Sequence, residues 1–84
     1  MTAAVPVVDK YGEILAEILG HAGAQATVRS SEGVRRSDGV VVHVVVEVPD
    51  LSDWALRYAV LEAAGQIESE YGATVIPLFR EAVA

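Results

Sequence analysis

Two polar side chains interrupt a run of valines and are the first candidates for chemistry. His43 and Glu47 stand within residues 40–48, and their spacing puts both on the same face of a strand. A histidine can bind a metal ion or exchange a proton near neutral pH. In an extended chain the two groups lie roughly 13 Å apart, too far to share one metal ion. His43 is therefore either a structural residue or a ligand or pH-sensing group, and it could meet Glu47 only across a symmetric dimer.

A second set of polar side chains precedes the valines and could bind an anion. Hydroxyl groups and arginines at a strand end can hold a phosphate. Acids in the same polar segment, residues 30–39, offset much of the positive charge, so a solvated connection is favoured over an anion site. The candidate anion-binding residues are Ser30, Ser31, Arg35 and Arg36.

Candidates for metal binding and catalysis are few. The chain has no cysteine, and no histidines or carboxylates have the spacing of a metal site. His43 and Asp38 are weak candidate ligands for Mg²⁺ or Zn²⁺, and we expect no resident cofactor. No set of residues predicts a catalytic centre, so the sequence favours a protein that is not an enzyme.

Composition excludes several classes of partner. A formal charge of −6 and a pI near 4.6 argue against nucleic acid and against an anionic membrane surface. The first residues lack the basic start of a signal peptide, and no apolar run is long enough to span a membrane. The 84 residues therefore predict one domain with short tails at 1–7 and 80–84, and we expect a cytoplasmic location.

The elements that position these residues follow from the hydrophobic pattern. The spacing predicts a first helix over residues 9–20, capped by Asp9, and a first strand from Ala24 to Arg29. The valine run, 40–48, is a strand because β-branched side chains fit a pleated sheet. It ends at Pro49, which cannot continue a central ladder.

The second half of the chain predicts a helix and a strand. Either Asp50 or Ser52 caps the helix, which runs to Tyr71 and stops at Gly72. A third strand follows over 73–79. The main apolar stripe of this helix is widened beyond what one sheet face requires by Trp54, Tyr58 and Leu61.

This element order predicts an α+β two-layer sandwich. A three-stranded mixed sheet has both helices on one face, and the third strand lies parallel to a neighbour. Either the first or the second strand could be central. The other sheet face is left uncovered, and an exposed apolar face of this kind marks an association surface. Its predicted interface residues are Val41, His43, Val45 and Glu47.

The stretch from Asp50 to Phe79 resembles small polymerase-beta-like nucleotidyltransferases, in which a valine-rich strand leads into a similar helix, an acidic-Tyr-Gly turn and a strand ending near a proline. Residues 28–33 fall where that family has its Gly-Ser loop, and Asp38 falls where its acidic metal-binding motif begins. Its second metal-binding carboxylate would stand at Val40. The resemblance therefore implies a decayed, inactive relative, because two-metal phosphoryl transfer needs paired carboxylates.

Residues 36–52 also resemble the cytosolic domain of cation diffusion facilitators. That domain has the same α-β-β-α-β order and dimerises, and it has a histidine where His43 stands. The helix histidine of that family is absent here, and Ile76-Pro77-Leu78 stands in place of its last-strand ligand motif. The resemblance implies a dimeric fold more than a metal site.

Three functions therefore remain open at the level of sequence. The leading one is a small, non-catalytic interaction or regulatory module that forms a homo-oligomer or binds a protein partner through the uncovered sheet face. The second is a nucleotide-binding protein or nucleotidyltransferase that uses the serines, the arginines and Asp38. The third is a divalent-metal-binding domain that uses His43 at a dimer interface.

Overall fold

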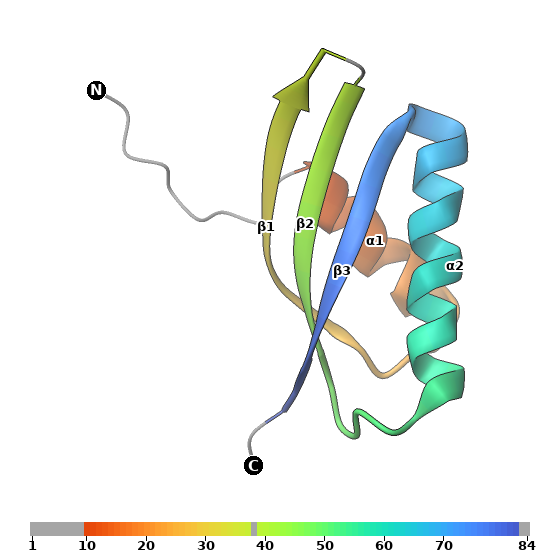
Figure 1. Cartoon of the computed structure of the whole chain (residues 1–84). Helices are drawn as coiled ribbons and strands as arrows, with labels where there is room; N and C mark the ends of the chain where they lie inside the picture. The colour runs from red at the N-terminus through yellow and green to blue at the C-terminus, as the bar shows by residue number, and fades with distance from the viewer. Residues whose placement is uncertain (1–9, 38, 83–84) are drawn as a thin grey trace.

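A computed structural model of the chain describes residues 10–37 and 39–82, and it confirms the predicted order α-β-β-α-β (Figure 1). The predicted N-terminal tail, Asp9 as the predicted cap of the first helix, and the last two residues of the predicted C-terminal tail lie outside these ranges. The elements are α1 (Lys10–His21), β1 (Thr27–Arg36), β2 (Gly39–Val48), α2 (Trp54–Tyr71) and β3 (Ala73–Glu81).

The three strands form one mixed sheet with β2 in the centre. β1 pairs with β2 antiparallel, and β3 pairs with β2 parallel, as the connection through α2 requires. The sheet order β1-β2-β3 resolves which strand is central. The strand with valines on both faces takes that place because both of its edges and both of its faces can be covered there.

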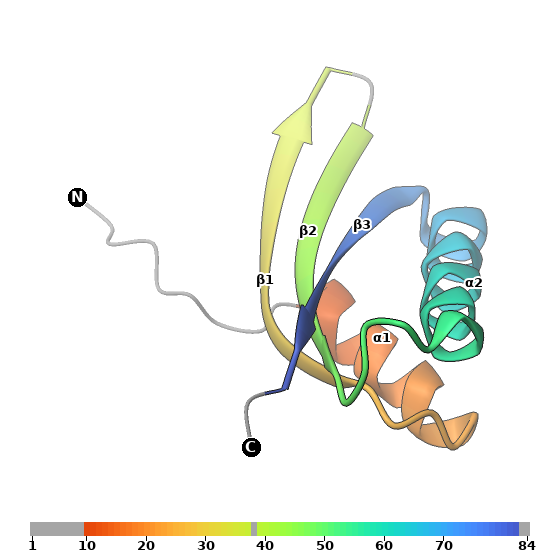
Figure 2. The ribbon, with the colours of Figure 1, turned by 60° about the horizontal axis from the view of Figure 1, so that its bottom comes forward.

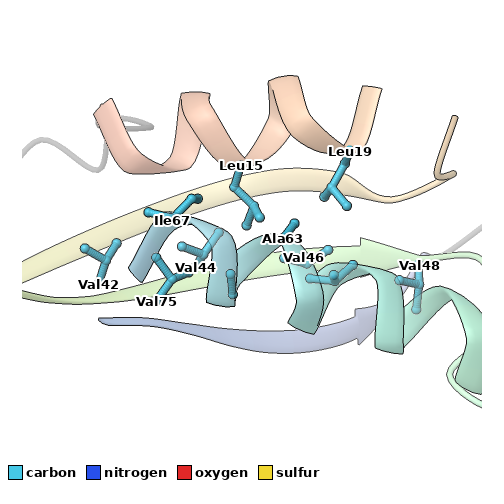
Figure 3. Close-up of a cluster of buried hydrophobic side chains, with 11 residues drawn as sticks. Leu15, Leu19, Val42, Val44, Val46, Val48, Ala63, Ile67 and Val75 are labelled. Atoms are coloured by element: carbon cyan, nitrogen blue, oxygen red, sulfur yellow. The ribbon is translucent and has the colours of Figure 1, made fainter. Parts of the chain in front are cut away.

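Both helices cover the same face of the sheet (Figure 2). The inward side chains of β2, Val42, Val44, Val46 and Val48, are fully buried. Leu15 and Leu19 of α1 and Ile67 of α2 pack against them (Figure 3). Each inward position of the strand therefore contributes a branched side chain to a single core.

The prediction for residues 30–39 is wrong, because most of that segment is strand. β1 begins at Thr27 rather than at the predicted Ala24, and it extends to Arg36, which pairs with Gly39 across the hairpin. β2 is ten residues long, and its backbone N–H and C=O groups need partners along its whole length. The polar residues before the turn supply these partners, so pairing with β2 outweighs their polar composition.

Three predicted boundaries also change. Asp53, not Asp50 or Ser52, is the N-cap of α2, and its carboxylate accepts a hydrogen bond from the Leu56 N–H at 3.1 Å. β3 continues past Phe79 to Glu81, into the residues predicted to be a tail. The last residue of α1 is His21 rather than Gly20.

Other boundaries are confirmed. β2 ends immediately before Pro49. α2 ends at Tyr71, and Gly72 adopts the left-handed conformation (φ 72°) and donates its N–H to the Glu68 carbonyl. Neither described helix is long and apolar enough to cross a membrane.

Replacing Ile67 with alanine should lower the free energy of unfolding by about 2–5 kcal/mol, because the fully buried side chain would leave a cavity. The matched control is Leu61→Ala in the same helix. Leu61 is 48% exposed, so its loss should cost less than about 1 kcal/mol. Urea unfolding measures both values, and equal losses would contradict this placement of the core.

Candidate functional site

The sheet face opposite the helices is the candidate site, and its residues follow from side-chain alternation. Odd-numbered residues of β2 point away from the core, and the sheet register places their neighbours on β1 and β3 beside them. We call this surface the open face. It comprises Thr27, Ser30, Glu32, Val34 and Arg36 of β1, then Val41, His43, Val45 and Glu47 of β2, and finally Thr74, Ile76, Leu78 and Arg80 of β3.

Apolar side chains from all three strands surround the middle of the open face. Val41 and Val45 are half-buried between their neighbours. Val34 is 41% exposed, Ile76 38% and Leu78 48%. The sequence prediction named only the β2 residues of this group. Side chains alternate between the two faces along residues 74–78, and this alternation could have identified Ile76 and Leu78 as members of the group. Val34 lay in the segment predicted to be a connection.

His43 lies at the centre of this apolar group. It is half-buried, and the register places Glu32 opposite it on β1 and Ile76 beside it on β3. The predicted common face of His43 and Glu47 is present. Glu47 nevertheless forms ion pairs with Arg29 and Arg80, so within one chain it does not pair with His43.

Glu47 joins all three strands through two arginines. The Arg29 Nε donates to Oε1 of Glu47 at 3.0 Å, and the Arg80 Nε donates to Oε2 at 3.1 Å. A second guanidinium nitrogen of Arg80 also contacts Oε2. The Glu47 side chain is only 12% exposed, whereas those of Arg29 and Arg80 are 54% and 57% exposed. This three-residue cluster, the Glu47 clasp, closes one end of the open face.

Sequence reasoning missed the Glu47 clasp because it depends on details of strand pairing. The register between β1 and β2 shifts between Val28 and Ser30, which makes Arg29 an extra residue in the ladder. Arg80 lies opposite Glu47 only because β3 extends into the predicted tail. Neither the bulge nor the extension has a composition that identifies it in advance.

The clasp also changes the acidity of its carboxylate. Hydrogen bonding from Arg80 is the largest cause that lowers the pKa of Glu47 below its usual value of 4.5, and Arg29 adds to it. Partial burial acts in the opposite direction and is outweighed. Glu47 is therefore ionised at neutral pH, and its charge is balanced within the clasp.

The candidate anion-binding residues do not converge on one surface. Ser30 pairs with Val45, and Arg36 pairs with Gly39, both on the open face. Ser31 is 7% exposed opposite Val44, and Arg35 lies opposite Val40, both on the other face. Adjacent residues of a strand point to opposite sides. The two serines therefore lie on different faces of the sheet, and so do the two arginines.

The candidate metal ligands are likewise not assembled. Within the described residues no three His, Asp or Glu side chains lie together in a way that could hold a metal ion. His43 has one carboxylate neighbour by register, Glu32. Asp38 lies outside the described residues.

Comparison with known protein families, curated proteins and solved structures gives no match to this chain. The geometry of the open face is therefore the basis for a proposal about function.

Replacing Glu47 with glutamine should lower the melting temperature at pH 7, because both arginines lose a charged partner. A carboxylate whose pKa is lowered by folding stabilises the fold above the unfolded pKa, and this stabilisation is lost as pH falls through the folded pKa. The difference between wild type and Glu47→Gln should therefore be constant above about pH 6 and shrink below pH 4.5.

Thermal unfolding across pH measures this difference at one low chain concentration. Glu62→Gln, at an exposed position of α2, is the control and should leave the profile close to wild type. A difference for Glu47→Gln that grows as the solution is acidified would contradict the lowered pKa.

Proposed function

We propose that this chain is a non-catalytic association module, and that a second copy of the same chain packs face to face on the open face. The observation that carries the proposal is the apolar group around His43, on a sheet whose other face is covered by both helices. Apolar side chains gathered on one side of a small domain favour burial against another surface.

Charge distribution supports a second copy as the occupant. The chain carries 12 acids and 6 basic residues. Among the described residues, three basic residues lie on the open face or at its end, Arg29, Arg36 and Arg80, against two acids, Glu32 and Glu47. Two copies that meet by this face therefore avoid the like-charge repulsion expected from a net charge of −6.

The helix-covered side is a much poorer surface for self-association. Both helices carry exposed glutamates, and two copies that met through them would bring like charges together. These residues are Glu13, Glu17, Glu62, Glu68 and Glu70. The charges thus favour an arrangement in which the sheets meet in the middle and the acidic helices face water.

A symmetric pair also accounts for the polar groups of the open face. In a two-fold interface, if one residue contacts a different residue of the other copy, the same contact occurs a second time with the two copies exchanged. Unlike groups on the same face can therefore pair with each other between copies. Glu32 and the arginines provide both signs of charge around the apolar group. The Glu47 carboxylate is already paired with two arginines, so a second copy can cover it without leaving this carboxylate unpaired.

Replacing Leu78 or His43 with lysine should weaken the dimer by about 2 kcal/mol or more, because a symmetric interface would bury the added charge twice. Leu78 is half exposed in the single chain, so Leu78→Lys should leave the fold intact. The matched control is Gln66→Lys, which adds the same charge at an exposed position of α2, away from the open face.

Sedimentation equilibrium over micromolar to millimolar concentrations gives the dissociation constants, and circular dichroism checks folding. A monomeric wild type throughout this range would overturn the proposal. Equal dimerisation of wild type and folded Leu78→Lys would also overturn it.

A further inference from the structure

The outward side of α2 carries apolar residues where a surface helix normally carries charges. Val60, Ala63 and Ile67 form its buried side. Trp54, Tyr58, Leu61 and Gly65 recur at i, i+4, i+7 and i+11, which places them together on the opposite side. Trp54 and Tyr58 are each 68% exposed, and Leu61 is 48% exposed. We call these four residues the outer stripe.

Trp54 is held in place at one end of the outer stripe. The Arg57 guanidinium lies over the Trp54 ring at 4.4 Å and over the Phe79 ring at 5.1 Å. Nη1 of Arg57 also donates to the Leu51 carbonyl at 3.0 Å. An exposed ring held by such contacts loses little conformational freedom when a partner covers it, which favours binding.

Gly65 leaves space at the other end of the outer stripe. A Cβ added there would meet no other atom within 4 Å, so packing inside the domain does not require glycine. Glycine also disfavours a helix relative to alanine. The missing side chain lets the backbone of an approaching element come close to α2.

The surroundings of the outer stripe are acidic. Asp50 and Asp53 precede the helix, and Glu62 and Glu68 lie along it. Hydrogen bonds from the Ser52 side chain and backbone lower the pKa of Asp50, so its carboxylate stays ionised. Arg57 is the one basic residue within α2, and its guanidinium contacts the Trp54 and Phe79 rings and the Leu51 carbonyl.

We propose that the outer stripe docks an amphipathic helix of another protein, which carries Lys or Arg beside its apolar residues. Basic side chains would complement the acidic surroundings and could also lie over the exposed Tyr58 ring. A second copy of α2 would bring the same acids, and nucleic acid or anionic lipid would bring phosphates, so charge opposes all three. This surface is separate from the open face, and the proposal does not depend on dimerisation.

The test uses two synthetic amphipathic peptides with the same leucine stripe, one flanked by lysines and the other by glutamates. Trp54 is the only tryptophan, so its fluorescence reports directly on the outer stripe. The lysine peptide should shift the Trp54 emission to shorter wavelength with saturable binding, because the ring leaves water. The glutamate peptide should bind at least about tenfold more weakly.

Two variants separate docking at the outer stripe from general attraction to an acidic chain. Tyr58→Ser removes an exposed ring, and Gly65→Gln fills the open space, so each should weaken binding about tenfold. Gly65→Gln should keep or raise the melting temperature, since glutamine favours a helix more than glycine does. Gly20→Gln is the matched control, because Gly20 is also helical, exposed and without neighbours within 4 Å.

Binding of the lysine peptide that both stripe variants weaken and Gly20→Gln preserves is the expected result. Three results would overturn the proposal: no emission shift with the lysine peptide, equal binding of the two peptides, or folded stripe variants that bind as tightly as wild type. Leu78→Lys should bind the lysine peptide as wild type does, which separates this test from that of the dimer.

Discussion

Successive side chains of β2 point to opposite sides of the sheet; the inward ones are all valines, and the outward ones include Val41 and Val45. The inward ones are sealed beneath α1 and α2. The outward ones, Val41 and Val45, are left half-buried on a face that nothing in the chain's described residues covers. The strand thus needs a helical layer on one side, and its apolar side chains on the other side favour burial under a second layer. A second copy of the chain would provide that layer.

The parts of the fold that were predictable are those with a strong local signal. The valine strand, the end of α2 at Gly72 and the element order all follow from periodicity and capping. The extent of β1 was not predictable in this way, because Ser30, Glu32 and Arg36 are polar and become strand only by pairing with β2. The open face could be located from alternation in β2, but its full width depends on register with β1 and β3.

The Glu47 clasp shows why a site can be beyond sequence reasoning even when each residue is visible. Arg29, Glu47 and Arg80 are far apart in the sequence and come together through a bulge and a parallel register. Strand pairing also explains why the candidate anion-binding residues do not come together: the two serines are adjacent in sequence and lie on opposite faces of a strand. The two apolar surfaces differ in charge: the open face is nearly balanced, and the surroundings of the outer stripe are acidic. These charges are the reason why we propose self-association through the open face and a basic partner at the outer stripe.

The most direct test of the open face as a dimer interface is an isotope-filtered NOE measurement on an equal mixture of labelled and unlabelled chains. Such a sample reports only contacts between copies. Intermolecular NOEs at the methyl groups of Val41, Val45, Ile76 and Leu78, with none at Leu15 or Ile67, are the predicted result. Intermolecular NOEs confined to the helices, or none at concentrations where the chain sediments as a dimer, would contradict the face-to-face arrangement.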